Sequence, residues 1–363
     1  MSETAAEDTA SGTGESVIEL FQLPKAELHL HIEGTLEPGL AFELAHRNRV
    51  TLPFGSVEDL ASRYRFENLR GFLDLYYTTM AVLRTEDDFA DLARAYLGRA
   101  KAQGVRHAEV FFDLQAHLRR GVPAEAVVDG LSAALAEAEH DAGITGGLIL
   151  CFLRDLPVAD ADAALTAAMP RVDRLLGVGL DSAELGHPPG PFAPVFRRAR
   201  EAGLRAVAHA GEEAPAAYIQ EALDTLGVER VDHGIRAVDD PRLIERLVTG
   251  RVPLTVCPLS NVRLKTVGSL REHPLPELMD LGVVVTVNSD DPAYFGGYVA
   301  DNFLALSREA GLTLRAAERL ARNSIAASFV TPGRAASLIA EVDRWAHAVR
   351  DRPPGRPAAG PPY

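Results

Sequence analysis

A short segment near the start of the chain carries two histidines that could share a metal ion. Residues Ala26–Gly34 read Ala-Glu-Leu-His-Leu-His-Ile-Glu-Gly, and His29 and His31 stand two apart at the end of an apolar run. In a β-strand, residues i and i+2 point to the same face, so both imidazoles would face the same way. Imidazole suits zinc, and a zinc ion that keeps an open position activates water. Two surface histidines on an exposed strand would give the same pattern, so the rest of the sequence has to decide.

Further groups suited to zinc chemistry follow other apolar runs of the chain. They are His209, His233 and the pair Asp290–Asp291. Most of the remaining histidines fall in segments that read as helix or loop, where a surface or core histidine is the ordinary interpretation. Chance would scatter such groups along the chain, so their position behind separate apolar runs favours a metal-dependent site.

Glu212 could supply a proton at such a site. It lies three residues after His209 in His-Ala-Gly-Glu, where Gly211 permits a tight turn that brings the carboxyl group back towards a substrate. Burial would raise the pKa of this carboxyl group and let it act as a general acid.

His233 and Asp291 complete the set of candidate reactive groups. His233, in Val-Asp-His-Gly, can hydrogen-bond a metal-bound water. Asp290 and Asp291 are adjacent at a strand end and should face different ways, one towards metal and the other towards substrate. The alternative for the pair is helix capping before Pro292, and the other motifs favour the site.

The segments that must position these groups alternate between two kinds. Strands are predicted at Ala26–His31, Arg106–Phe112, Gly147–Phe152, Leu176–Asp181, Arg205–His209, Arg230–His233, Pro253–Cys257 and Val283–Asn288. Segments of helical period lie between them, among them Asp87–Gln103, Ala124–Ala142, Pro191–Ala202, Ala216–Leu226, Pro241–Val248 and Pro274–Leu281. Eight such units predict an α/β fold, a single (β/α)8 TIM barrel whose site lies at the C-terminal ends of the strands. A doubly wound open sheet would usually bring a glycine-rich phosphate loop after the first strand, and this chain has none there.

A barrel brings strand ends that are distant in sequence to one mouth. It predicts a zinc site of three imidazoles and one carboxylate: His29, His31, His209 and Asp290. The segment between the first two strands is longer than one helix and predicts extra helices that cover the mouth. Tyr64–Thr79, rich in aromatic residues, is the candidate lid, and plain helix packing is the alternative.

Composition limits the partners of the chain. Its 363 residues are 47% hydrophobic, enough for a large core, and its formal net charge of −14 disfavours nucleic acid and anionic membranes. There is no apolar stretch of membrane-spanning length, and the first residues lack the pattern of a signal peptide. We therefore expect a cytoplasmic protein that acts on a small molecule, with a homo-oligomer left open.

Both ends of the chain differ in composition from the middle. Residues 1–16 predict a flexible acidic tail, 349–363 a flexible Pro/Gly-rich tail, and 17–348 the metal-dependent barrel domain. Cys151 and Cys257 lie in apolar runs and predict two buried thiols instead of a disulfide.

Several of these motifs occur together in one known family. The chain carries His-Leu-His-Ile-Glu-Gly-Thr-Leu-Glu-Pro, His-Ala-Gly-Glu, Cys-Pro-Leu-Ser-Asn and Asn-Ser-Asp-Asp-Pro-Ala-Tyr-Phe. From about Leu23 to Phe329 it resembles the adenosine/adenine deaminase family of the amidohydrolase superfamily. The resemblance implies a (β/α)8 barrel with one zinc ion per chain and hydrolytic removal of the purine 6-amino group as ammonia.

The resemblance also implies a role for each candidate residue. Glu212 corresponds to the acid that protonates purine N1, His233 to the residue that orients or deprotonates the attacking water, and Asp291 to the group that hydrogen-bonds N7. The metal ligands correspond to His29, His31, His209 and Asp290.

Two segments depart from the nucleoside deaminases of the family. The chain has Asp181-Ser182-Ala183-Glu184 where these enzymes carry a glycine in the last position, and Asp232-His233-Gly234 where they carry Gly-His-Gly. Both segments resemble the bacterial and fungal adenine deaminases of purine salvage. Free adenine carries an N–H at N9 or N3 where a nucleoside carries ribose, so Glu184 is predicted to accept that hydrogen and to disfavour ribose.

Other functions remain open at this point. One is deamination of adenosine or another adenine nucleoside such as aminodeoxyfutalosine. Another is a non-catalytic barrel that binds purine or metal, although such a protein would not need Glu212, His233 and Asp291 together. A phosphotriesterase-like hydrolase is disfavoured because no lysine follows the fourth strand.

Overall fold

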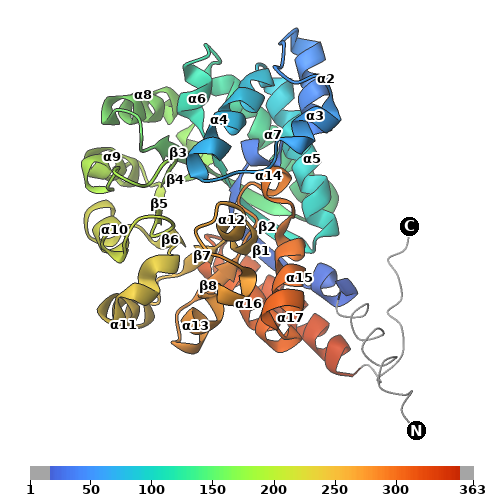
Figure 1. Cartoon of the computed structure of the whole chain (residues 1–363), viewed down its shortest axis with the longest axis vertical. Coiled ribbons are helices and arrows are strands. Elements are labelled where there is room, and N and C mark those ends of the chain that lie inside the picture. The colour runs from blue at the N-terminus through green and yellow to red at the C-terminus, as the bar shows by residue number, and fades with distance from the viewer. Residues whose placement is uncertain (1–16, 352–363) are drawn as a thin grey trace.

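Eight parallel strands form the centre of the computed structural model, which describes residues 17–351 (Figure 1). Their order in the sheet is their order in the chain. The strands are β1 (Lys25–His31), β2 (Val105–Phe112), β3 (Thr145–Leu153), β4 (Leu175–Asp181), β5 (Arg205–Ala210), β6 (Arg230–His233), β7 (Leu254–Val256) and β8 (Val285–Val287). All eight predicted strands are confirmed, with small differences at their ends.

The sheet closes between its first and last strands just beyond the end of β8. Leu30 and Asp290 form an isolated parallel bridge. The N–H of His31 donates to the carbonyl of Asp290 at 3.0 Å, and the N–H of Asp290 donates to the carbonyl of His29 at 3.1 Å. The predicted (β/α)8 barrel is therefore confirmed, and its closing hydrogen bonds involve candidate metal ligands.

Helices surround the strands on all sides in Figure 1. They are α2 (Pro38–Asn48), α3 (Val57–Ser62), α4 (Leu69–Thr79), α5 (Glu86–Ala102), α6 (Leu114–Leu118), α7 (Ala124–Ala142), α8 (Val158–Ala168), α9 (Ala193–Glu201), α10 (Ala216–Glu221), α11 (Pro241–Gly250), α12 (Pro258–Arg263), α13 (Leu275–Asp280), α14 (Pro292–Phe295), α15 (Val299–Ala310), α16 (Leu314–Ala327) and α17 (Pro332–Arg350). Local sequence sets several boundaries. Thr85 and Asp88 form a capping box at the start of α5, and α7 ends at Gly143, whose φ of 68° is left-handed.

Extra helices cover the mouth of the barrel, as the sequence predicted. The segment between β1 and β2 contains α2, α3 and α4. Phe72 of α4 packs on Phe295 of α14 with ring centroids 4.7 Å apart, and Tyr64 stacks on Tyr294 at 4.6 Å. Because α14 begins directly after Asp291, these contacts hold the candidate lid against the loop that carries the aspartate pair.

A small apolar cluster in the barrel interior packs against the histidines. Phe111, Ile149, Cys151 and Val207 form a separate buried cluster, and the Phe111 ring lies 5.2 Å from the rings of both His29 and His31. Cys151 and Cys257 are both buried free thiols, as predicted. This packing supports the imidazoles from beneath.

The predicted tails, 1–16 and 349–363, lie outside the described residues except for 349–351, where α17 reaches Arg350. Between residues 17 and 351, none of the helices has both the length and the apolar character that crossing a membrane requires.

A buried ion pair joins opposite sides of the barrel. Arg230, at the start of β6, lies 2.6 Å from Glu109 of β2, and both side chains are almost fully buried. The Arg230 guanidinium also lies 4.0 Å from the centroid of the Phe329 ring. Burial alone would raise the pKa of Glu109, but Arg230 and the hydrogen bond from His107 outweigh burial and hold this pKa below its usual value. Glu109 is therefore a buried anion that depends on its partner.

We expect Arg230→Met to lower the free energy of unfolding by about 3–5 kcal/mol, because it leaves Glu109 buried without a counter-ion. Equilibrium urea denaturation measures the change. Arg246→Met is the matched control, since Arg246 pairs with Asp224 on the surface and its loss should cost less than about 1 kcal/mol. Equal effects of the two substitutions would contradict a stabilising role for the buried pair.

Candidate active site

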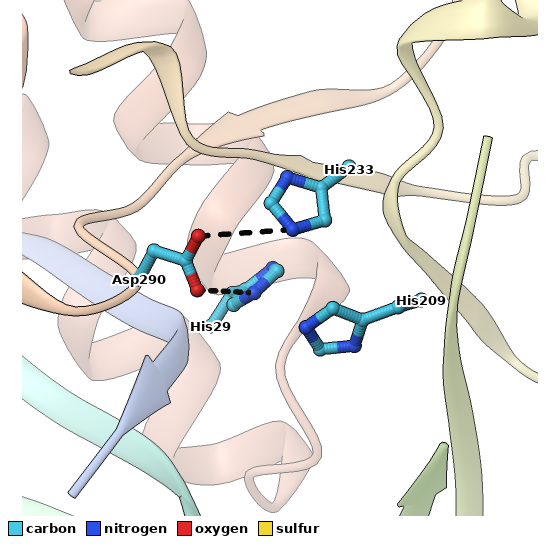
Figure 2. Close-up of side chains that lie close together, drawn as sticks. All are labelled: His29, His209, His233 and Asp290. Carbon is cyan, nitrogen blue, oxygen red and sulfur yellow. Dashed lines mark hydrogen bonds and ion pairs between the residues drawn. The ribbon is translucent and has the colours of Figure 1, made fainter. Parts of the chain in front are cut away.

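The strand ends bring the predicted metal ligands together. His29 and His31 lie on β1, His209 on β5, and Asp290 just after β8. Nε2 of His29 lies 3.1 Å from Oδ1 of Asp290, and Nε2 of His31 lies 3.5 Å from the same oxygen. The Nε2 atoms of His31 and His209 are 3.1 Å apart. The four predicted ligands are therefore buried close together, and Figure 2 shows His29 next to Asp290, with His209 on the other side of His29.

The spacing and chemistry of these atoms fit a metal ion. Ligand atoms about 2.0–2.1 Å from a tetrahedral zinc lie roughly 3.3 Å from one another, close to the separations found here. The Nε2 atoms of the three histidines lie near one another and near Oδ1 of Asp290. Their lone pairs are therefore available to a single cation.

The outer nitrogens of the same imidazoles are held by the protein. Nδ1 of His29 lies 3.0 Å from the carbonyl oxygen of Thr255, which places its proton there and leaves Nε2 as an acceptor. Nδ1 of His31 lies 3.5 Å from Asp181, and Nδ1 of His209 lies 3.5 Å from Asp232. Metal-binding histidines are commonly oriented in this way by an oxygen behind the ring. Burial also lowers the pKa of His31 to about 3, so its ring is neutral.

His233 lies as close to this group as some of the predicted ligands. Ligand atoms of His29, His209, His233 and Asp290 all lie within 4.8 Å of one another. Nε2 of His233 is 3.7 Å from Asp290 and 3.6 Å from Oε2 of Glu212 (Figure 2 shows the former). His233 therefore stands between the metal-ligand group and Glu212.

A cavity opens over these groups. It is lined by His31, Leu69, Phe72, Leu73, Tyr76, Tyr77, Asp113, Asp181, Ser182, His209, Glu212, His233, Leu264, Asp290, Asp291 and Phe295. The predicted lid thus contributes five side chains to the wall: Leu69, Phe72, Leu73, Tyr76 and Tyr77. The cavity joins the metal-ligand group to the predicted acid and substrate-binding groups.

The carboxyl groups around the cavity differ in charge. Burial would raise the pKa of Asp290, but the neighbouring histidines outweigh burial and hold it well below its usual value. Burial and the charge of Asp290 raise the pKa of Glu212 and of Asp291 well above their usual values. Asp290 is therefore an anion suited to a metal, and Glu212 and Asp291 are protonated carboxyl groups that can donate a hydrogen bond.

Glu212 and Asp291 each keep a free oxygen in the described structure. Oε1 of Glu212 and Oδ1 of Asp291 are buried and have no hydrogen-bond partner among residues 17–351. The His-Ile-Glu-Gly motif ends in a glycine because any larger residue would collide with Asp291: a Cβ atom at Gly34 would lie 2.0 Å from Oδ1 of Asp291. The motif therefore leaves room for the Asp291 carboxyl group.

The backbone is strained where the site residues turn. His233 and Asp290 have φ values of 59° and 64°, and Ser182 has 70°, in the left-handed region that side chains other than glycine rarely adopt. All three lie at or just after the ends of barrel strands. This strain directs their side chains in ways that a strand pattern alone does not predict.

Glu184 is placed differently from the prediction. Its carboxylate oxygens accept hydrogen bonds from four backbone N–H groups, those of Gly211, Glu212, Glu213 and Ala214. It is almost fully buried and does not line the cavity. The expectation that Glu184 faces the substrate is therefore wrong for this structure, because the backbone of the following loop already occupies both of its oxygens.

Asp113 and Asp181 line the cavity, but the sequence analysis did not single them out. Asp113 directly follows β2 and Asp181 ends β4, and each has a buried Oδ1 without a hydrogen-bond partner in the described part of the chain. Burial raises the pKa of Asp113 to about 7, and burial and Asp113 raise the pKa of Asp181. The signal that identified Asp290, an aspartate at the C-terminal end of a strand, would have found both.

Comparison with known proteins agrees with this geometry. Residues 24–345 match the model of the adenosine deaminase family. The chain belongs to the adenosine deaminase family.

Its relatives match over nearly their full length. The adenine deaminase of Streptomyces coelicolor is 60% identical over 328 residues, which cover 90% of this chain and 96% of that protein. The adenine deaminase of Cupriavidus necator is 54% identical over 342 residues, with 94% and 97% covered.

Two solved structures share the fold. The adenine deaminase of Arthrobacter aurescens has a TM-score of 0.88 at 54% identity and covers 89% of this chain and 99% of its own. An amidohydrolase of Burkhoderia ambifaria, solved with bound Zn, has a TM-score of 0.85 at 27% identity, with 96% and 98% covered.

We expect the purified chain to carry a bound divalent metal ion, and His29→Ala and Asp290→Ala to retain less than about a tenth of it, because each removes a converging ligand atom. Elemental analysis by mass spectrometry measures the metal. His46→Ala, an exposed histidine of α2, is the control and should keep wild-type metal content. Full occupancy in either ligand variant would refute the assignment.

Proposed function

We propose that the chain catalyses the hydrolytic deamination of adenine to hypoxanthine and ammonia, a reaction of purine salvage, with one zinc ion per chain. The observation that carries the proposal is the cavity in which two buried carboxyl groups of raised pKa, Glu212 and Asp291, flank the metal-ligand group. Relatives named adenine deaminase at 54–60% identity support adenine as the substrate.

His29, His31, His209 and Asp290 would hold the zinc ion. A zinc ion there supplies Lewis acidity that lowers the pKa of a water molecule towards neutrality. Metal binding needs neutral imidazoles and an ionised carboxylate. Burial lowers the pKa of His31 and His209, and the pKa of Asp290 is low. Burial opposes protonation of His29 too, but Asp290 outweighs it and raises the pKa of His29, so this ring would lose its proton when the cation binds.

The residues around the ligands supply the proton transfers. Burial and the neighbouring histidines lower the pKa of His233 well below its usual value, so the neutral ring can accept a proton from the attacking water. Glu212 donates its proton to N1 as the water oxygen adds to C6. Asp291 donates a hydrogen bond to N7. The proton held by His233 then passes to the amino group, and the C6–N bond breaks as ammonia leaves. The remaining O–H proton returns to the Glu212 carboxylate, and C6 becomes the carbonyl carbon of hypoxanthine.

We expect Glu212→Gln to lower kcat with adenine by about 10²–10⁴-fold while the variant keeps its metal, because an amide cannot protonate N1. Steady-state ammonia release and metal analysis measure both properties. Glu213→Gln is the matched control, since Glu213 is the next residue and does not line the cavity. Glu212 is not the acid if Glu212→Gln keeps a wild-type kcat.

His233→Asn is expected to lower kcat by a similar factor through loss of the proton acceptor for water. The variant should retain metal, which separates this role from ligation. Loss of metal from His233→Asn would instead make His233 a ligand.

The cavity also bears on the choice between free base and nucleoside. Asp113 and Asp181 offer buried oxygens for the N–H that free adenine carries at N9 or N3, and the aromatic side chains of α4 close the same cavity. A nucleoside would lack that N–H and would add ribose beside these side chains.

We expect kcat/KM for adenine to exceed that for adenosine by about a hundredfold or more, because a site built to pair a polar group rejects an analogue that lacks it. Initial rates with adenine, adenosine and aminodeoxyfutalosine under one condition measure the preference. A higher kcat/KM for either nucleoside would replace adenine as the proposed substrate, and no turnover of any of the three would favour a binding protein.

A further inference from the structure

The loop that carries Glu212 is bound to a single buried carboxylate. Gly211, Glu212, Glu213 and Ala214 follow β5 directly, and their four consecutive N–H groups all point at Glu184. The N–H of Gly211 donates to Oε1 at 2.6 Å. The next three donate to Oε2, at 3.1, 2.8 and 2.8 Å. Successive backbone N–H groups that converge in this way form an anion-binding nest.

Gly211 makes this loop conformation accessible. Its φ of 71° lies in the left-handed region, and a Cβ atom there would lie 2.5 Å from Ile219. The left-handed residue followed by a turn directs the next N–H groups to the same side. The glycine of His-Ala-Gly-Glu therefore shapes the nest into which Glu184 fits.

Glu184 is itself held firmly in place. It follows the turn at Ser182 that ends β4, and its carbonyl oxygen accepts from the N–H of His187 at 3.0 Å. Arg154, after β3, donates to the carbonyl oxygens of His187 and His209, both at 2.7 Å. The ends of β3, β4 and β5 are thus joined through two buried side chains of opposite charge.

The Glu212 side chain has little else to hold it. Its Oε1 has no hydrogen-bond partner among the described residues, and Oε2 approaches His233 only to 3.6 Å. The position of its carboxyl group therefore depends on its backbone, and the N–H of Glu212 is one of the four that Glu184 accepts. A shift of about 1 Å in a reacting group is enough to lower a rate by about 10²-fold.

We propose that Glu184 is a positioning residue for the general acid: it fixes the loop 211–214 and so directs the Glu212 carboxyl group at the substrate. This inference rests on the proposed role of Glu212. It assigns Glu184 no contact with the substrate.

The first test replaces Glu184 by glutamine, which has nearly the same shape but only one acceptor oxygen. The amide must turn its NH2 towards either Gly211 or the other three donors. We expect Glu184→Gln to lower kcat with adenine by about 10–100-fold and to change KM by less than about threefold. We expect the ratio of kcat/KM for adenine and adenosine to stay within about threefold of wild type. Glu213→Gln, on the same loop, should match wild type in all three quantities.

The second test asks whether Glu184 acts through Glu212. In a double-mutant cycle, kcat of the Glu184→Gln/Glu212→Gln variant should equal that of Glu212→Gln within about twofold, because the misplaced acid is already absent. A further loss of kcat on adding Glu184→Gln to Glu212→Gln, by the same factor as Glu184→Gln lowers kcat in wild type, would overturn the proposal. So would a wild-type kcat in Glu184→Gln, or a changed substrate ratio with unchanged kcat, which would restore a substrate contact.

A third measurement needs no variant and keeps the proposal testable if Glu184→Gln does not fold. In wild-type protein the amide hydrogens of residues 211–214 should exchange with deuterium at least about 10²-fold more slowly than unstructured amides. Unprotected exchange in this loop would overturn the nest. Turnover of adenine by wild type tests the proposed function separately, so the two ideas can fail independently.

Discussion

The hydrogen bonds that close the barrel between β1 and the end of β8 determine the rest of the site. The backbone of Asp290 pairs with His29 and His31 in both directions, and the Leu30–Asp290 bridge sets the register. Because Asp290 adopts a left-handed φ of 64°, its side chain turns back to the imidazoles of the same two residues. One closing contact thus builds the ring of strands and brings the carboxylate to the metal-ligand group.

The low pKa of Asp290 in turn divides the carboxyl groups of the cavity into two kinds. Asp290 stays ionised because three imidazoles face it, whereas the adjacent Asp291 and the nearby Glu212 must be buried beside its negative charge. Negative charges placed so close together in a buried site repel one another, so Asp291 and Glu212 keep their protons. The same kind of side chain, a carboxyl group, therefore serves as a metal ligand at Asp290 and as a proton donor at Asp291 and Glu212, because the three positions differ in their neighbours.

Backbone groups matter as much as side chains in placing the acid. The Glu184 carboxylate is buried close to Glu212, and four backbone N–H groups and the nearby Arg154 stabilise it there. Its charge is satisfied locally, so it can stabilise the loop without competing for substrate. Because both oxygens of Glu184 are bound to the backbone, this carboxylate does not face the cavity in this structure, although a carboxylate would suit substrate recognition.

The sequence by itself determined the strands, the barrel and the identity of the converging groups. Alternating apolar runs and helical segments are local patterns, and a closed parallel barrel brings the C-terminal ends of all its strands to one mouth. His29, His31, His209 and Asp290 could therefore be placed together without coordinates. Only the tertiary structure decided where Glu184, Asp113 and Asp181 point. Beyond a strand end the side-chain direction depends on single φ values, such as 70° at Ser182, and on hydrogen bonds to a distant loop. Neither leaves a periodic trace in the sequence, so the carboxylate predicted to bind substrate instead binds the backbone that carries the acid.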